Sequence, residues 1–331
     1  MAQLIREIGK SGVSASAIGL GTWAMGGWMW GGHDDANSIK AIQASIDAGI
    51  TLIDSAPAYG LGRAEEIVGK AIEGRRDQVV IATKCGLVWD TDKGNYFVDE
   101  HDKKIHRYLG AKSVRAELEA SLKRLRTDYV DLFITHWQDP TTPVSETMGE
   151  LEDLKREGKI RAIGISNVNP AEMKDYLAAG QLDCIQECYN MLDRQLEDEL
   201  LPLCLKNEVA VLSYSSMALG LLSGKISPDR VFEGDDLRRE NPKFSVENRK
   251  RVAEFMDVLR PIASTHNVAP GQVVIAWTVA QPGITFSLCG ARNAQQAIEN
   301  ALAGDVVLSS DEIAVIDNAI AVHLGPVARA A

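Results

Sequence analysis

Four polar side chains with complementary chemistry follow apolar runs in the first half of the chain. Asp54 comes directly after ITLI, Tyr59 lies five residues further on, Lys84 closes VVIATK, and His136 closes DLFITH. A phenol has a pKa near 10 and must be tuned by about two or three units to move a proton at neutral pH. A neighbouring ammonium, itself kept charged by a carboxylate, would lower that pKa, and a neutral imidazole could orient a carbonyl oxygen. The set therefore predicts acid–base chemistry on a carbonyl group.

Each of these residues also has an ordinary structural alternative. A carboxylate at a strand end often caps a helix or pairs with a base, a lysine there is often solvated, and His136 with Trp137 could be a half-buried packing pair. Their occurrence at the ends of successive apolar runs favours the functional interpretation.

Hydrophobic periodicity predicts the elements that position these side chains. Short runs rich in Val and Ile alternate with longer amphipathic segments whose apolar residues recur every three or four positions. Left-handed glycine C-caps are expected to end three of the helices, at Gly49, Gly158 and Gly180. Eight strands are expected, at residues 16–23, 50–56, 78–84, 129–137, 160–166, 182–187, 209–215 and 284–290.

Eight strand–helix units favour a parallel sheet covered by helices, and 331 residues suit a closed (β/α)8 TIM barrel as one domain over residues 1–331. A doubly wound sheet is the competing fold, but no GxGxxG stands at a strand-to-helix turn. Long loops are expected after strands 3 and 7, at 85–111 and 216–246, with an extra C-terminal helix over 309–320. In a barrel, all the carboxyl ends of the strands surround one mouth, where the four polar residues would meet.

Composition argues against several classes of function. A net charge of −11 argues against a nucleic-acid surface or an anionic membrane as partner. The N-terminus carries Arg6 and Glu7 in its only apolar stretch, unlike a secretory signal, and no apolar run is long enough to span a membrane. Five scattered cysteines without a CxxC pair predict reduced thiols, a cytoplasmic protein and no metal site.

The ordered motifs resemble the aldo-keto reductase superfamily, from GLGTW at residue 19 to the end of GARNAQQAIEN at residue 300. The family's order of Asp, Tyr, TK and His is met by Asp54, Tyr59, Lys84 and His136. The resemblance implies that Tyr59 is the general acid and that the other three support it. GTWAMGGWMWGG and DDLRRENPKF resemble the bacterial subgroup of general-stress and glyceraldehyde reductases, which implies short aldehydes or sugar-derived carbonyls as substrates.

If the protein binds a nicotinamide cofactor, suitable polar and aromatic side chains are expected at the remaining strand ends. Ser166, Asn167 and Gln186 could hold a carboxamide or could simply form turns, and Tyr214 could stack on a nicotinamide or belong to the core. The resemblance implies an NADP(H) site, with NAD(H) possible, formed by Thr22, Trp23, Asp54, Ser166, Asn167, Gln186, Tyr214, Ser215, Ser216, Leu219, Gly220, Lys225, Arg238, Gly290, Arg292, Gln296, Glu299 and Asn300.

Three of these positions bear on the choice of coenzyme and on the loop expected to bind the pyrophosphate. A helix is expected to begin near Asn293, and its N-terminus together with Arg292 could clamp a 2′-phosphate. Gln296 stands where many relatives carry an arginine for that phosphate. Ser216 replaces the family's proline in SYSSMALGLLSGK.

Aromatic residues near the expected barrel mouth suggest a substrate wall. Stacking and exclusion of water suit carbonyl compounds, although an oligomer contact could also cover tryptophans. The wall would consist of Trp23, Trp30, Trp89 and Trp137.

Three functions fit these features. The first is an NADP(H)-dependent reductase of aldehydes or ketones, acting on a small-molecule carbonyl as a monomer or homo-oligomer. The second is an NAD(P)-dependent aldose or alcohol dehydrogenase working in the oxidative direction. The third is a weakly catalytic redox sensor, similar to the β subunits of potassium channels.

Overall fold

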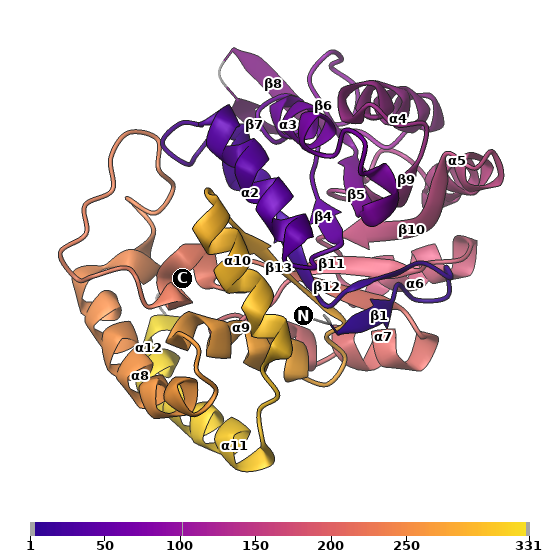
Figure 1. The fold of residues 1–331 in the computed structure, drawn as a ribbon. Coiled ribbons are helices and arrows are strands. Elements are labelled where there is room, and N and C mark those ends of the chain that lie inside the picture. The colour runs from indigo at the N-terminus through magenta and orange to yellow at the C-terminus, as the bar shows by residue number, and fades with distance from the viewer. Residues whose placement is uncertain (1–3, 101, 329–331) are drawn as a thin grey trace.

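Eight parallel strands form a closed barrel in the computed structural model, which describes residues 4–100 and 102–328 (Figure 1). The strands succeed one another around the barrel in chain order, and the last pairs with the first. They are β3 (Ile18–Gly21), β4 (Leu52–Asp54), β5 (Val80–Cys85), β9 (Val130–Thr135), β10 (Ile160–Ser166), β11 (Cys184–Cys188), β12 (Ala210–Tyr214) and β13 (Phe286–Gly290). Each overlaps an expected strand, so the predicted (β/α)8 barrel is confirmed and the doubly wound sheet is wrong.

Alternation along the strands divides the core into two layers. Leu52 and Leu132 point into the barrel, where they join a cluster that also contains Ile8 from the N-terminal segment. Their neighbours Ile53 and Phe133 belong to the larger cluster between strands and helices. Successive side chains on a strand face opposite sides, so apolar residues at consecutive positions are what a sheet buried on both faces requires.

The helices cover the outside of the barrel, and α2 and α10, which are far apart in the sequence, lie side by side (Figure 1). Ser309 and Glu312 form a capping box at the start of α11, which confirms the extra C-terminal helix. The helices are α1 (Trp23–Gly26), α2 (Asp35–Asp47), α3 (Arg63–Ala71), α4 (Ala111–Leu125), α5 (Val144–Arg156), α6 (Pro170–Ala179), α7 (Leu200–Asn207), α8 (Val246–Thr265), α9 (Pro270–Ala280), α10 (Ala294–Leu302), α11 (Ser310–Ala319) and α12 (Gly325–Ala328).

Two of the three glycine C-cap predictions are confirmed. Gly49 and Gly158 have φ of 93° and 75°, in the left-handed region. The prediction for Gly180 is wrong, because its φ of 175° is extended backbone. A Cβ at Gly180 would lie 2.3 Å from Oε1 of Glu152 on α5, the end of a flexible side chain that can move aside, and nothing in the structure explains the glycine there.

Both long connections lie where they were expected, but the first is not an irregular loop. It contains β6 (Leu87–Val88), β7 (Asn95–Glu100) and β8 (Lys103–Arg107), an antiparallel sheet in the order β6–β8–β7. The connection after β12 contains only the short 3-10 helices η3 (Ala218–Ser223) and η4 (Pro242–Phe244). A hairpin of β1 (Ile5–Glu7) and β2 (Ser14–Ser16) precedes the barrel; its three-residue strands are too short to show a period in the sequence.

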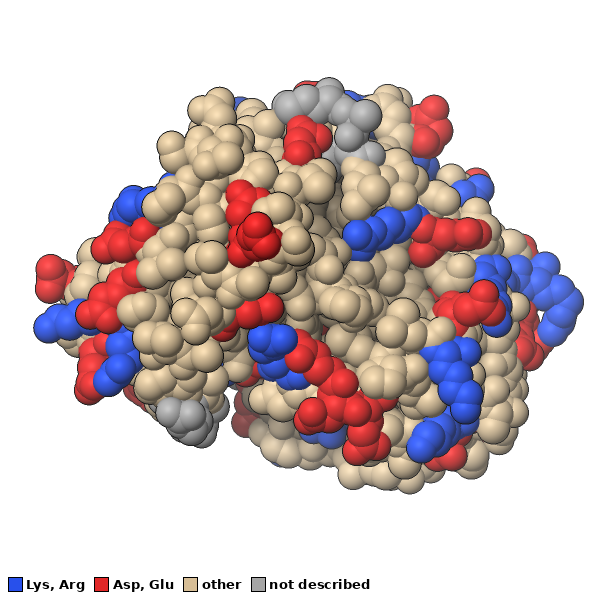
Figure 2. Space-filling view, turned by 90° about the horizontal axis from the view of Figure 1, so that it is seen from below, with Lys and Arg blue, Asp and Glu red and all other residues tan. Residues whose placement is uncertain are grey.

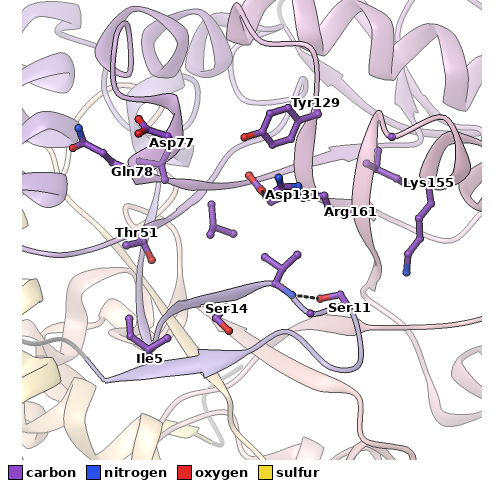
Figure 3. A pocket seen from close by; sticks show the side chains of 16 residues that line it. Ile5, Ser11, Ser14, Thr51, Asp77, Gln78, Tyr129, Asp131, Lys155 and Arg161 are labelled. Atoms are coloured by element: carbon purple, nitrogen blue, oxygen red, sulfur yellow. Dashed lines mark hydrogen bonds and ion pairs between the residues drawn. The ribbon is translucent and has the colours of Figure 1, made fainter.

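The amino ends of the barrel strands border a cavity of about 750 Å³ (Figure 3). Ser14 of the N-terminal hairpin, Thr51 before β4, Asp131 on β9 and Arg161 on β10 lie around it. The polar residues expected to do chemistry stand at the opposite ends of the same strands. This cavity is therefore separate from the candidate active site.

Surface charge is mixed on the face shown in Figure 2, where acidic and basic side chains are interspersed and no broad area is exclusively basic. No helix within the described residues is long and apolar enough to cross a membrane.

Candidate active site

Lys84 lies at the centre of the predicted catalytic group. Its Nζ donates to Oδ1 and Oδ2 of Asp54, both at 2.8 Å, to the carbonyl oxygen of Ser55 at 2.8 Å, and to Oη of Tyr59 at 3.0 Å. Lys84 is completely buried and Asp54 is 3% exposed. Every ammonium hydrogen therefore has an acceptor, and the side chain is held in one position.

The barrel register explains why these residues meet. β4 and β5 are neighbours, and Asp54 lies opposite Ala82, two residues before Lys84. The turn that carries Tyr59 packs against α1 through two glycines. A Cβ on Gly26 would lie 2.6 Å from the Tyr59 carbonyl oxygen, and one on Gly60 would lie 2.3 Å from the Gly26 oxygen. Only glycine allows this approach of the two backbones.

His136 completes the group from the end of β9. Its ring packs edge-to-face on the Tyr59 ring, with centroids 5.8 Å apart. Its backbone N–H donates to the Cys85 carbonyl at 2.8 Å, and its carbonyl accepts from Nδ2 of Asn167 at 2.8 Å. The structure thus brings together all four residues that the sequence singled out.

Burial and charge set the protonation states of the group. Burial raises the pKa of Tyr59 well above its ordinary value, and the Asp54 carboxylate raises it further. Burial lowers the pKa of Lys84, while the Asp54 carboxylate acts in the opposite direction. The expected lowering of the Tyr59 pKa is therefore wrong for this structure, because burial of the phenol and the Asp54 carboxylate outweigh the neighbouring Lys84 ammonium.

His136 has the protonation state that the sequence predicted. Burial lowers its pKa well below the usual value, and the Lys84 ammonium lowers it further. The imidazole is neutral at pH 7 and can donate one hydrogen bond. Tyr59 stays protonated, and among the described residues no acceptor takes its hydroxyl hydrogen.

A second carboxylate behind Lys84 was missed by the sequence analysis. Glu65 on α3 is completely buried and accepts from Oγ1 of Thr83 at 2.5 Å and from Nε of Arg124 at 2.6 Å. Its charge partly opposes the lowering of the Lys84 pKa by burial. The charged residues of RAEE are ordinary for a solvated helix face, so the sequence carries no local signal for this contact.

The residues expected to hold a carboxamide lie next to one another, and their polar groups are bonded together. Ser166 Oγ donates to the Gln186 carbonyl at 2.6 Å, and Gln186 Nε2 donates to Oδ1 of Asp54 at 2.7 Å. Tyr214 Oη donates to Oδ1 of Asn167 at 2.8 Å. Thr22 Oγ1 donates to the Asp54 carbonyl at 3.0 Å. These bonds orient the ends of β10, β11 and β12 toward the catalytic group.

Gln138 is a further residue of this region that sequence reasoning missed. Its Nε2 donates to the Ser166 carbonyl at 3.0 Å and its Oε1 accepts from Tyr176 at 2.8 Å. It stands two residues after His136, where a search of that loop for polar side chains could have found it.

The segment after β12 contains a run of left-handed backbone. Ala218, Leu219 and Gly220 have positive φ in succession, and so does Ser215. Residues other than glycine rarely adopt this backbone conformation. In such turns, neighbouring backbone N–H groups can point at a common anion. Ser216 Oγ lies 3.3 Å from the Ser213 carbonyl and supplies an internal tie where the family's proline is missing.

Charged residues of the expected cofactor site occupy the neighbouring loops. Lys225 pairs with Glu299. Arg238 binds both carboxylate oxygens of Asp236, with Nε–Oδ1 and Nη2–Oδ2 distances of 2.8 and 2.6 Å. Arg292 directly precedes Asn293, the N-cap of α10. These groups could hold the phosphates of a dinucleotide.

Smaller contacts arrange the start of α10. Gln296 Oε1 accepts from the Arg292 backbone N–H at 2.8 Å, so this side chain supports the turn that carries Arg292. Asn300 Nδ2 donates to the Gly290 carbonyl at 3.1 Å, tying α10 to the end of β13.

Comparison with known proteins agrees with this geometry. Residues 17–321 match the model of the family described as the aldo/keto reductase family. This chain belongs to that family. It is 41% identical over 327 residues to aldo-keto reductase YhdN of Bacillus subtilis (strain 168), covering 97% of this chain and 96% of that protein.

Two further similarities concern named activities. The NADH-specific methylglyoxal reductase of Escherichia coli (strain K12) is 40% identical over 308 residues, which cover 91% of this chain and 94% of that protein. The solved glycerol dehydrogenase AKR11B4 from Gluconobacter oxydans has a TM-score of 0.86 at 37% identity and covers 97% of this chain and 95% of that one.

The four tryptophans expected to line the substrate site of this aldo/keto reductase form two groups, Trp23 with Trp30, and Trp89 with Trp137 against one apolar cluster. The Trp23 ring centroid lies 6.3 Å from that of Tyr59, and Trp137 directly follows His136. Trp89 packs against the cluster formed by Leu87 and its neighbours. Trp30 lies 5.3 Å from Trp23, and its ring also contacts the guanidinium groups of two arginines, Arg238 and Arg292.

Proposed function

We propose that this aldo/keto reductase reduces small aldehydes and ketones to alcohols with NADPH or NADH, and that Tyr59 donates the proton. The single observation that carries the proposal is the Asp54–Lys84–Tyr59 network with His136 beside it at the carboxyl ends of β4, β5 and β9. When bound, the nicotinamide supplies two electrons and a hydrogen to the carbonyl carbon, so the chain itself must bind the carbonyl oxygen and protonate it.

The raised pKa of Tyr59 supports its role as an acid. A phenol that stays protonated at neutral pH has its proton available whenever a substrate arrives, and an alkoxide is basic enough to take it. Lys84 donates to Oη and stabilises the phenolate that remains, while Asp54 keeps Lys84 charged. Neutral His136 donates a hydrogen bond to the carbonyl oxygen and orients it.

The site residues fit a nicotinamide dinucleotide. The left-handed backbone of Ala218, Leu219 and Gly220 suits a pyrophosphate, and Arg292 at the start of α10 suits a 2′-phosphate. We propose NADP(H) as the preferred coenzyme on this basis. The 40% identity to a relative named as NADH-specific, together with Gln296 in place of arginine, keeps NAD(H) as the competing choice.

Small dicarbonyls and sugar-derived aldehydes are the proposed substrates. The Escherichia coli relative is named as a methylglyoxal reductase, and the aromatic rings of Trp23 and Trp137 next to the catalytic group suit compact carbonyl compounds. A second candidate function is oxidation of small polyols by the same residues in reverse, which the likeness to a glycerol dehydrogenase favours.

The purified protein should be assayed with NADPH and with NADH against methylglyoxal and glyceraldehyde, and with NADP⁺ and NAD⁺ against glycerol. The proposal expects a higher kcat/KM for carbonyl reduction with NADPH. Faster oxidation of glycerol at neutral pH would favour the second candidate. Tight coenzyme binding without turnover in either direction would favour a redox sensor and refute both.

A further inference from the structure

Arg107 lies on the antiparallel sheet β6–β8–β7, one face of which packs against the turn that carries Tyr59. Alternation along KKIHR on β8 places Ile105 and Arg107 on the same face. Ile105 belongs to the buried cluster with Leu87 and Ala58, the residue before Tyr59. Arg107 therefore lies on the face of this sheet that covers the catalytic turn.

Aromatic rings hold the Arg107 guanidinium in place. Its central carbon lies 4.5 Å from the ring centroid of Phe97 and 5.0 Å from that of Trp137. The two rings also contact each other, with centroids 5.2 Å apart. Trp137 directly follows His136, and Arg107 pairs in register with Leu87, three residues after Lys84. Arg107 thus lies beside two segments that directly follow strands supplying catalytic residues, β6 after β5 and Trp137 after β9.

Arg107 has no anionic partner within residues 4–100 and 102–328. Its Nε is buried without a hydrogen-bond partner, and none of the ion pairs formed there includes it. By contrast, Arg238 is bound by both carboxylate oxygens of Asp236. The chain has 46 acidic residues, so acidic partners for an arginine are abundant in the sequence. A partly buried cation without a counter-charge is unfavourable, and cation–π contacts offset only part of that cost.

We propose that Arg107 binds an anionic group of the substrate, a carboxylate or a phosphate, at a distance from the carbonyl that Tyr59 protonates. The planar guanidinium can donate two parallel hydrogen bonds to either group, and the rings of Phe97 and Trp137 hold its plane. The inference rests on the carbonyl reduction proposed above. Within the small carbonyl compounds proposed above, it assigns those that carry a carboxylate or a phosphate as the preferred substrates.

Matched substrate pairs test this inference. Succinic semialdehyde is compared with its neutral methyl ester, and glyceraldehyde 3-phosphate with glyceraldehyde, by kcat/KM under identical conditions. The wild-type enzyme should favour at least one anion over its neutral partner about tenfold or more. In Arg107→Leu that ratio should fall roughly 10- to 100-fold, the range for losing hydrogen bonds to a charged group. The pair that responds tells carboxylate from phosphate.

Lys104→Gln is the matched control, because Lys104 is an exposed cation on the opposite face of the same strand. It should leave both ratios within about twofold, since a surface charge there is screened. Equal ratios in wild type and Arg107→Leu, or a wild-type preference for both neutral partners, would overturn the inference.

Two measurements separate a failed inference from other failures. If Arg107→Leu does not fold, the kcat/KM ratio of Arg107→Lys is compared with that of the wild type. The lysine keeps the charge but loses the paired donors, so it should still lower the ratio. If the wild type reduces no carbonyl at all, the proposed function fails. Calorimetric titration with succinate and with inorganic phosphate then tests Arg107 alone, and wild-type binding no tighter than that of Arg107→Leu refutes its role.

Discussion

Replacing Tyr59 by Phe separates the proton donor from the structure around it. The change removes Oη, which accepts from Lys84 Nζ at 3.0 Å, and leaves the aromatic ring against His136 and Trp23. Lys84 keeps both oxygens of Asp54 and the Ser55 carbonyl as acceptors, each at 2.8 Å. The folded state should therefore lose only about 1 kcal/mol, the ordinary cost of one hydrogen bond.

Catalysis should suffer much more than stability. A positioned general acid contributes about 10²- to 10⁴-fold in rate, which corresponds to roughly 3–5 kcal/mol of barrier. Because the lost group acts on the developing alkoxide, kcat should fall while coenzyme affinity stays close to wild type. The expected increase in the activation barrier exceeds the expected loss of folding free energy by several kcal/mol. A general loss of stability therefore cannot account for the expected fall in kcat.

Three measurements test this expectation. Steady-state reduction of methylglyoxal gives kcat, quenching of tryptophan fluorescence gives coenzyme affinity, and urea unfolding gives stability. Tyr96→Phe is the matched control, because Tyr96 is 56% exposed on β7 and should change none of the three. A Tyr59→Phe enzyme that retains more than about a tenth of wild-type kcat would refute the assignment of Tyr59 as the proton donor.

Three further changes test two charged residues of the site and one buried carboxyl group on α4. Lys84→Met leaves the Asp54 carboxylate buried without its partner and should lower the free energy of unfolding by about 3–5 kcal/mol, while adding Asp54→Asn should recover part of the loss in a urea titration; a stable single variant would contradict the buried pair. Arg292→Ala should weaken NADPH binding roughly tenfold or more and NADH binding much less, with exposed Arg239→Ala as control, so equal losses for both coenzymes would speak against the 2′-phosphate assignment. Burial raises the pKa of Glu117 to about 8 from 4.5, so the folded protein holds a proton that the unfolded chain releases, and stability should fall as pH rises across that window. Glu117→Gln should flatten this fall in the urea midpoint, and an unchanged slope would argue against the shift.

Much of the fold could be predicted because its signals are local. Consecutive apolar residues indicate strands buried on both faces, as Ile53 beside Leu52 illustrates. The Ser309–Glu312 pair, within four residues of sequence, indicates where a helix begins. Asp54, Lys84 and His136 could be chosen for a similar reason. A polar side chain at the end of a buried run stands out in the sequence, and barrel topology brings all such ends to one mouth.

The tertiary structure alone decided how these groups influence one another. The direction of the Tyr59 pKa shift depends on the burial of the phenol and on the Asp54 carboxylate, which belongs to a neighbouring strand end. Glu65 and Arg107 look like surface charges in the sequence and became significant only when packing placed one behind Lys84 and the other beside Trp137. Patterns in a sequence report the neighbours of a residue along the chain, whereas desolvation and Coulomb interactions depend on its neighbours in space.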